Sequence, residues 1–290
     1  MSDTTALCRR AAMTAALNGH QSRFLVALAT SKSTKPALVQ RFLRAFHMLL
    51  RIDSHEAWPK SIIERIDAHQ GLLRSAKYME NLIESQPFRA IAEDLEGFIR
   101  ENRILAYHCT KEAETGFFLR NGLRILNRTQ HQAEFLNRYG YLFSPAELQH
   151  MHQEWETYFA GAQDNGRNGS LWFCLAPNQV VSDGTERLFR CFGGEAIYMP
   201  LTHHAAITSK LEAIGSPVVV EVSIDPNQLH TFCELTFALK ALSILHRKRN
   251  SDAYFHSQEG YLTCNVSPHE IVRVIPKEAF FSAHAEWWSS

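Results

Sequence analysis

A histidine and a threonine lie at the end of a strongly apolar run in the middle of the chain. The run from Ile104 to Thr110 reads ILAYHCT, with His108 two positions before Thr110. If the run forms a β-strand, both side chains point to the same face of that strand. An imidazole and a hydroxyl on one face are suited to hydrogen-bond the hydroxyl groups of a sugar. The alternative is a core histidine bonded to a backbone carbonyl, and this fragment alone leaves both interpretations open.

The common catalytic and phosphate-binding motifs are absent from the sequence. The chain contains no Walker A loop, no G-x-G-x-x-G after a strand, no G-x-S-x-G and no H-E-x-x-H. Two adjacent histidines, His203 and His204, occur in THHA. Adjacent side chains rarely bind one metal ion, and no carboxylate pattern accompanies this pair. We interpret them as surface or loop histidines and predict no metal.

The composition is typical of a globular protein. The 290 residues are 45% hydrophobic and 21% charged, and 30 Lys and Arg balance 30 Asp and Glu. No segment approaches the roughly 18 apolar residues of a membrane span. The six cysteines are scattered without a C-x-x-C pair, which disfavours zinc-ribbon and thioredoxin-like sites. Scattered free thiols indicate a reducing compartment, so we expect a cytoplasmic protein with no membrane partner.

The first hundred residues are predicted to be helical. The segment 36–52, PALVQRFLRAFHMLLRI, places its apolar residues on one stripe with helical spacing. The segment 58–84 has Pro59 and Ser61 near a helix start and continues with apolar residues, and 87–102 reads as another amphipathic helix. These residues show no strand pattern. They predict a helical N-terminal region over residues 1–102.

From Ile104 onward the sequence indicates strands mixed with helices. After ILAYHCT comes a helix-like stretch, which Asn121 and Gly122 end as a C-cap, and then LRIL (123–126) reads as a short strand. Residues 130–160 are again helical, while 233–250 form a helix or a long excursion. Further strands are predicted at SLWFCLA (170–176), GSPVVVEVSI (215–224), GYLTCNV (260–266) and EIVRVIP (270–276). The fold class is therefore α+β.

The order of these motifs over residues 103–280 resembles the ADP-ribosyltransferase superfamily. The order is YHCT, a helix, NGLRIL, SLWF, GGEAIY, and then an acidic residue that opens a late strand. That superfamily includes enzymes with a His-Tyr-Glu type of site and toxin-like bacterial enzymes that modify DNA or RNA. The resemblance implies a split β-sheet domain with inserted helices over residues 103–290. It also implies NAD as the co-substrate and requires no metal.

The resemblance assigns binding roles to five side chains. His108 and Thr110 match the strand-borne motif that binds the ribose and amide side of NAD. Trp172 falls where the third strand of the family carries a tyrosine, and Phe173 follows it. Tyr198, in GGEAIY, matches the aromatic residue that stacks on the nicotinamide ring. An offset stack of this kind contributes about 1 kcal/mol beyond burial.

Three glutamates are candidates for the catalytic carboxylate that the resemblance implies. Glu259 opens a late strand before a proline-containing loop, as the family's catalytic glutamate does, and is the first choice. Glu195, in GGEAIY, is the second choice, and Glu270 is the third. For each of them the alternative is an exposed surface carboxylate. An arginine that assists the pyrophosphate would come from Arg120, Arg124 or Arg128.

The implied activity is mono-ADP-ribosyl transfer from NAD to a macromolecular acceptor, which would be RNA, DNA or protein. No acidic residue occurs between Asp3 and Asp53, where eight Arg and Lys are found, and residues 246–250 read HRKRN. Such basic segments suit a nucleic-acid acceptor or an acidic inhibitor protein such as an antitoxin. A solvated helical face is the alternative. The implied role is a bacterial toxin or a phage-defence effector.

Three other functions remain open from the sequence. One is an NAD glycohydrolase, in which water takes the place of the acceptor. Another is a non-catalytic ligand- or protein-binding module on the same fold. Cys109 in place of the usual glycine, and Trp172 in place of tyrosine, motivate that second alternative. The last is a helical interaction protein whose function is carried by the first hundred residues.

Overall fold

The computed structural model describes residues 48–285 except 126, 161–167 and 232–236. All of them belong to one compact unit, which spans Met48–Ser290. The predicted helix at 36–52 and the acid-free segment therefore lie mostly outside the described residues. Among the described residues, no helix combines the length and the apolar character needed to cross a membrane.

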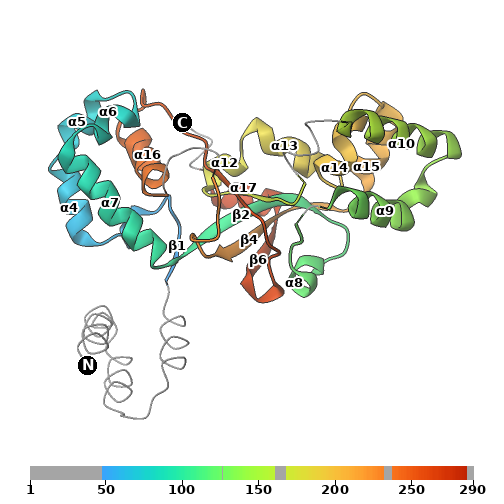
Figure 1. Ribbon diagram of the computed structural model, residues 1–290, viewed down its shortest axis with the longest axis horizontal. Coiled ribbons are helices and arrows are strands. Elements are labelled where there is room, and N and C mark those ends of the chain that lie inside the picture. The colour runs from blue at the N-terminus through green and yellow to red at the C-terminus, as the bar shows by residue number, and fades with distance from the viewer. Residues whose placement is uncertain (1–47, 126, 161–167, 232–236, 286–290) are drawn as a thin grey trace, which may run out of the picture. The chain divides into compact units, whose positions relative to one another are not determined.

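A six-stranded sheet forms the centre of this unit (Figure 1). Its strand order is β5-β3-β2-β4-β6, with the short β1 beside β2. The pairings are antiparallel except for that of β1 with β2. The α+β class predicted from the sequence is confirmed. The strands are β1 (Leu49–Leu50), β2 (Arg103–Glu112), β3 (Leu171–Cys174), β4 (Ser216–Ile224), β5 (Glu259–Leu262) and β6 (Ile271–Pro276).

Strands β2 and β4 form the continuous part of the sheet. They are paired from Ile104↔Ile224 to Glu112↔Ser216. The β-branched run Val218–Val220 suits a strand that is covered on both faces, and those three valines are buried. Strand β3, by contrast, meets β2 at one residue pair, Tyr107↔Cys174. The sheet is therefore nearly divided between β2 and β3.

Five helices, α4 to α7 before β2 and α16 after β4, form one layer beside the sheet. Helix α16 (Phe237–Arg249) packs against α5, α6 and α7, and α4 also packs against α7. Their apolar faces share one core with β2 and β4. In α7 the side chain of Ser85 accepts a hydrogen bond from the Phe88 amide, as an N-cap does. The other helices of this layer are α4 (Lys60–Asp67), α5 (Gln70–Ser75), α6 (Met79–Ile83) and α7 (Gln86–Arg100).

A second group of helices, which we call the helical lobe, has its own core. It consists of α9 (Arg128–Tyr139), α10 (Pro145–Phe159), α14 (Glu195–Tyr198) and α15 (Ala205–Ala213), and lies at the right of Figure 1. Ser144 and Glu147 form a capping box at the start of α10, as the Ser-Pro-Ala-Glu sequence predicts. The remaining helices are α8 (Phe117–Asn121), α12 (Pro177–Val180), α13 (Asp183–Arg190) and α17 (Lys277–Ala283). Short 3-10 turns occur at His55–Ala57, Gly140–Leu142, Met199–Leu201 and Pro268–Glu270.

Two local predictions are wrong. Leu49 and Leu50 form a strand and not the end of a helix, because their backbone groups pair with the first two residues of the central strand β2. Residues 123–125 of the predicted strand LRIL do not form a strand either, and residue 126 lies outside the described residues. Leu123 makes an isolated bridge to Val266, and the Ile125 amide bonds the side chain of Asn265.

The boundary expected after residue 102 lies between α7 and β2. Leu95 of α7, Ile104 of β2 and Val220 of β4 belong to one buried cluster. The described helices before residue 103 therefore share their core with the sheet.

Gly122 fixes the end of α8, and its replacement by alanine is expected to be strongly destabilising. Its φ is +72°, and an added Cβ would overlap the backbone oxygen of Val266. We expect Gly122→Ala to lower the free energy of unfolding by at least about 3 kcal/mol in urea titration. Gly97 is the control, because it is in helix α7 with nothing within 4 Å of an added Cβ. Gly97→Ala should stabilise the protein by about 0.5–1 kcal/mol, and equal effects of the two changes would contradict this account.

Candidate functional site

A cavity of about 790 Å³ opens where β2 and β3 diverge. This volume lies within the roughly 300–1,000 Å³ of typical ligand pockets. Its walls come from β2, β3, α8, α9, α13 and the start of β5. Six of the eight side chains that the resemblance singles out line it: His108, Thr110, Trp172, Phe173, Glu195 and Glu259. These residues are far apart in the sequence, and the fold brings them together.

The side chain of His108 occupies the point where the β2–β3 ladder stops. Continuing the register from Tyr107↔Cys174 would place Cys109 opposite Trp172. The Cys109–Trp172 pair does not form, and Nδ1 of His108 donates a hydrogen bond of 2.8 Å to the backbone oxygen of Trp172. A carbonyl only accepts, so Nδ1 carries the proton and Nε2 of the neutral ring is an acceptor. The histidine is thus both a backbone-bonded residue and a lining residue of the cavity, which combines the two interpretations of the sequence.

The imidazole of His108 is held in its neutral form. Burial lowers its pKa below the ordinary value, and the hydrogen bond to the Trp172 carbonyl only partly offsets this. In the unfolded chain the ring has a pKa of about 6.5. Below that pH the unfolded state binds more protons than the folded state, so this group makes stability fall as the pH falls.

Substitution of His108 by glutamine is expected to flatten part of the pH dependence of stability. Glutamine keeps an N–H donor near the Trp172 carbonyl but cannot be protonated. Between about pH 7.5 and pH 5.5 the wild type should lose more stability than His108→Gln, because only the wild type gains a proton on unfolding at this position. Urea titrations at the two pH values measure the difference. An identical loss in both proteins would mean that folding does not lower the pKa of His108 and would contradict this account.

Aromatic side chains surround His108. Phe173 contacts the imidazole edge to face, with ring centroids 5.8 Å apart. Phe173 is 2% exposed and also belongs to the main core. The Trp172 ring packs on Tyr261 of β5 at 4.8 Å. Thr110 lies two positions beyond His108 on β2, as predicted, and lines the same cavity.

Glu259 is oriented by an amide side chain. Gln179 Nε2 donates to Glu259 Oε1 at 3.3 Å. Gln179 Oε1 in turn accepts a hydrogen bond of 3.1 Å from the backbone N–H of Gln258, which fixes the direction of the Gln179 side chain. A neutral donor leaves the negative charge of Glu259 uncompensated by this contact. The carboxylate lies at the start of β5, opposite Cys174 of β3.

The other two glutamates have cationic partners. Glu195 Oε1 is 2.9 Å from Arg187 Nη2. Glu270 does not line the cavity and accepts from Arg103 at 3.0 Å. Burial opposes ionisation of Glu270, but hydrogen bonds from Ser267 and Arg103 outweigh it and lower its pKa. This geometry favours Glu259 as the carboxylate available to a ligand in the cavity.

Tyr198 is not brought together with the other predicted residues. It is 1% exposed and lies in the core of the helical lobe with Trp155, whose indole N–H donates to the Ile197 oxygen. Residues 195–198 form helix α14, which starts at Glu195 and ends at Tyr198. The turn of this helix directs Glu195 to the cavity and Tyr198 to the lobe core.

Several aromatic residues of the cavity were not predicted from the sequence, and two of them are in contact with each other. Tyr139 of α9 and Phe192 line it, with ring centroids 5.1 Å apart. The hydroxyl of Tyr139 is buried without a hydrogen-bond partner among the described residues. A buried polar group of this kind needs an explanation, and a ligand in the cavity would supply one. The sequence pattern of residues 130–160 predicts a helix but does not indicate that Tyr139 faces a cavity.

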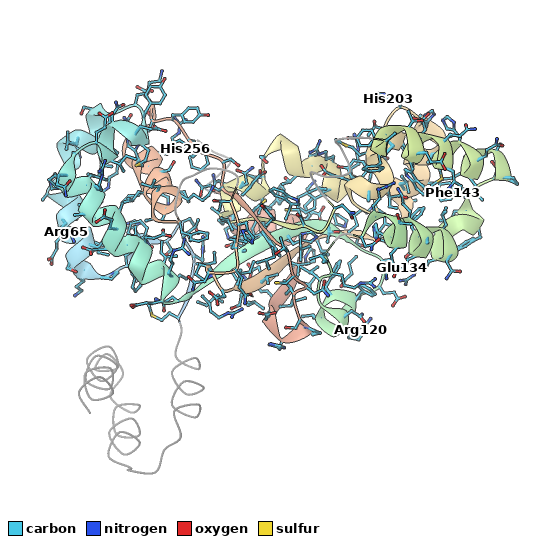
Figure 2. All side chains as sticks on the ribbon, in the orientation of Figure 1. Arg65, Arg120, Glu134, Phe143, His203 and His256 are labelled. Atoms are coloured by element: carbon cyan, nitrogen blue, oxygen red, sulfur yellow. The ribbon has the colours of Figure 1, made fainter. Side chains whose placement is uncertain are left out.

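The arginines that line the cavity are paired with glutamates of the same chain. Of the three arginines considered from the sequence, only Arg124 lines it, and it bonds Glu134 at 2.7 Å. Glu134 is labelled in Figure 2 and belongs to α9. Arg138 and Arg187 also line the cavity, and each bonds a glutamate. For one of these arginines to bind a pyrophosphate, its exposed ion pair would have to break, and the phosphate would replace the glutamate.

The cavity is not built for thiol chemistry. Cys109 and Cys174 are buried free thiols in its wall. The hydrogen bond between them and their burial raise the pKa of Cys174. A neutral thiol is a weak nucleophile. The side chains best placed to act on a ligand are therefore the Glu259 carboxylate and the neutral His108 ring.

Comparison of the chain with known protein families, with curated proteins and with solved structures finds no match.

Proposed function

We propose that the protein is a mono-ADP-ribosyltransferase that transfers ADP-ribose from NAD to a macromolecular acceptor. The observation that carries this proposal is the cavity between β2 and β3. It gathers a neutral histidine, a threonine, aromatic rings and a carboxylate in one ligand-sized space. These groups match the requirements of a ribosyl–nicotinamide substrate: hydrogen bonds for sugar hydroxyls, flat surfaces for a heterocycle and a negative charge beside the bond that breaks.

The proposed binding mode uses the divided sheet. NAD would lie between β2 and β3, as in the split sheet that the family resemblance implies. Nε2 of His108 would accept a hydrogen bond from a ribose hydroxyl, and the Thr110 hydroxyl would bond the same part of the ligand. Trp172 and the pair Tyr139 and Phe192 provide the aromatic surfaces. Tyr198 has no part in this binding mode, because it lies in the lobe core.

The proposed reaction breaks the glycosidic bond of NAD. Nicotinamide leaves with the bonding electron pair, and positive charge develops on the ribose as an oxocarbenium-like state. A fixed carboxylate stabilises such a charge electrostatically, as in glycoside hydrolysis. Glu259 would do this and would accept the proton that the acceptor loses when its oxygen or nitrogen bonds C1′. Gln179 holds Glu259 in place.

The basic residues at the end of α16 do not favour a nucleic-acid acceptor by themselves. Arg247 donates to the Ser251 and Ala253 oxygens, Lys248 donates to the Asp53 oxygen at 3.2 Å, and Arg249 bonds Asp67 at 2.7 Å. These bonds tie the end of α16 to neighbouring segments of the chain. The acceptor class must therefore be read from the reaction product.

Labelled NAD mixed with the protein and with separate pools of protein, RNA and DNA tests the proposal. Label transferred to one pool supports the transferase and identifies the acceptor class. Free ADP-ribose as the only labelled product would identify an NAD glycohydrolase, which shares this site. Unchanged NAD in all three mixtures, with no NAD binding, would contradict both activities and favour a non-catalytic module.

A further inference from the structure

Two histidines and a glutamate converge in the helical lobe, outside the cavity. His150 and Glu154 are on α10, one turn apart, and His204 immediately precedes α15. Their ligand atoms all lie within 4.8 Å of one another. We call this group the His–Glu–His cluster. His150 and His204 are 54 positions apart in the chain, so the adjacent pair in THHA does not indicate this contact.

The distances within the cluster are short. His150 Nε2 lies 3.0 Å from Nδ1 and 2.8 Å from Nε2 of His204. Glu154 Oε1 lies 3.8 Å from His150 Nε2 and 3.7 Å from His204 Nε2. The three side chains are 36%, 36% and 32% exposed in the order His150, Glu154 and His204. An ion from solvent can therefore reach them without unfolding the lobe.

Ordinary hydrogen bonding does not account for this arrangement. The two imidazole planes stand at 83° with centroids 3.9 Å apart. Since the lone pair of an imidazole nitrogen lies in its ring plane, one nitrogen of His150 cannot bond both nitrogens of His204. Glu154 is beyond hydrogen-bond distance of either ring. His204 also occupies the N-cap position of α15 but makes no capping bond with its side chain.

We propose that the His–Glu–His cluster binds one divalent transition-metal ion, with zinc as the preferred occupant. Two imidazoles and one carboxylate form a donor set typical of zinc with three protein ligands, which leaves one position for water. Imidazole ligands also favour Zn²⁺ over Mg²⁺ or Ca²⁺. Zinc–nitrogen bonds of about 2.0–2.1 Å in a tetrahedral site require the ring nitrogens to separate to about 3.3 Å. A small rotation of the two side chains provides that separation.

A bound ion would join α10 to the start of α15. The Lys210–Glu147 ion pair already links the same two helices at 2.7 Å. The ion would add a second link near the other end of the contact. The site lies apart from the cavity residues, so it stabilises the lobe independently of the proposed NAD chemistry.

Metal titration of the tag-free, full-length protein tests this proposal. The protein is first treated with a chelator that is then removed. Zn²⁺ should bind at one equivalent, measured by calorimetry, and Co²⁺ should give the visible absorption of a tetrahedral nitrogen–oxygen site. At about 100 times the dissociation constant, Zn²⁺ should raise the unfolding temperature by several degrees.

Variants identify the ligands. His150→Ala and His204→Ala should abolish both the binding and the temperature shift, and Glu154→Gln should weaken binding at least about tenfold. His203→Ala is the matched control, because His203 is the adjacent, exposed histidine, labelled in Figure 2. It should bind as the wild type does. If a histidine variant fails to fold in chelator, Glu154→Gln still decides the outcome. Unchanged binding in Glu154→Gln and His204→Ala, equal loss in His203→Ala, or no binding to the wild type would overturn the proposal.

Discussion

Replacement of Glu259 by glutamine is expected to reduce the rate of ADP-ribose transfer at least about 100-fold. Loss of one preorganised electrostatic group at a developing charge typically costs about 10²–10³ in rate. Glutamine has nearly the same shape and can still meet Gln179, so the fold and NAD affinity should be retained. The measurement is the initial rate of label transfer under saturating NAD, with the unfolding temperature as a check on folding.

Glu195→Gln is the matched control for this prediction. Glu195 lines the same cavity, but its carboxylate is bonded to Arg187. Its replacement should change the rate less than about tenfold, because the ion pair is half-exposed and such pairs contribute about 1 kcal/mol or less. If Glu195→Gln abolishes transfer while Glu259→Gln does not, the assignment of the two carboxylates is reversed.

Replacement of His108 by alanine is expected to weaken NAD binding at least about tenfold. The change removes an acceptor for a ribose hydroxyl, and a factor of ten corresponds to about 1.4 kcal/mol. It also leaves the Trp172 oxygen without the bond from Nδ1, which costs stability of about 1–3 kcal/mol. Calorimetric titration with NAD measures the affinity, and urea titration measures the stability.

Tyr198→Leu distinguishes this geometry from the one expected from the sequence. Leucine is the informative replacement, because a tyrosine that stacks on nicotinamide would still stack as phenylalanine. Because Tyr198 is in the lobe core, we expect Leu to lower stability and to leave NAD affinity within about threefold of wild type. A large loss of affinity in Tyr198→Leu, in a protein that remains folded, would place this residue at the ligand.

The sheet strands could be predicted because their signals are local. Runs such as Val218–Val220 are apolar and β-branched, and buried strands need this composition. The end of α8 was also predictable, since glycine at positive φ is a common helix terminator. In contrast, Leu49 and Leu50 have helical spacing with their predecessors, and only a partner strand from residues 103–104 makes them extended.

The features of the site that could not be predicted from the sequence depend on contacts between residues far apart in the chain. Nothing near Gln179 indicates that it orients Glu259, 80 positions away. Tyr198 fits an aromatic motif, yet its direction depends on α14 being helical. His204 is adjacent to His203 in the sequence, whereas its side-chain contacts are with His150 and Glu154 of α10. In each case the deciding information is tertiary packing, which overrides local pattern.

Release of nicotinamide from NAD is the most direct test of the central claim that the β2–β3 cavity binds and cleaves this substrate. Proton NMR follows free nicotinamide in mixtures of NAD, cell extract and either wild type or Glu259→Gln, so the result does not depend on knowing the acceptor. We expect nicotinamide with wild type, and NAD binding without nicotinamide in the variant. Equal release by both proteins, or neither binding nor release by wild type, would contradict the account.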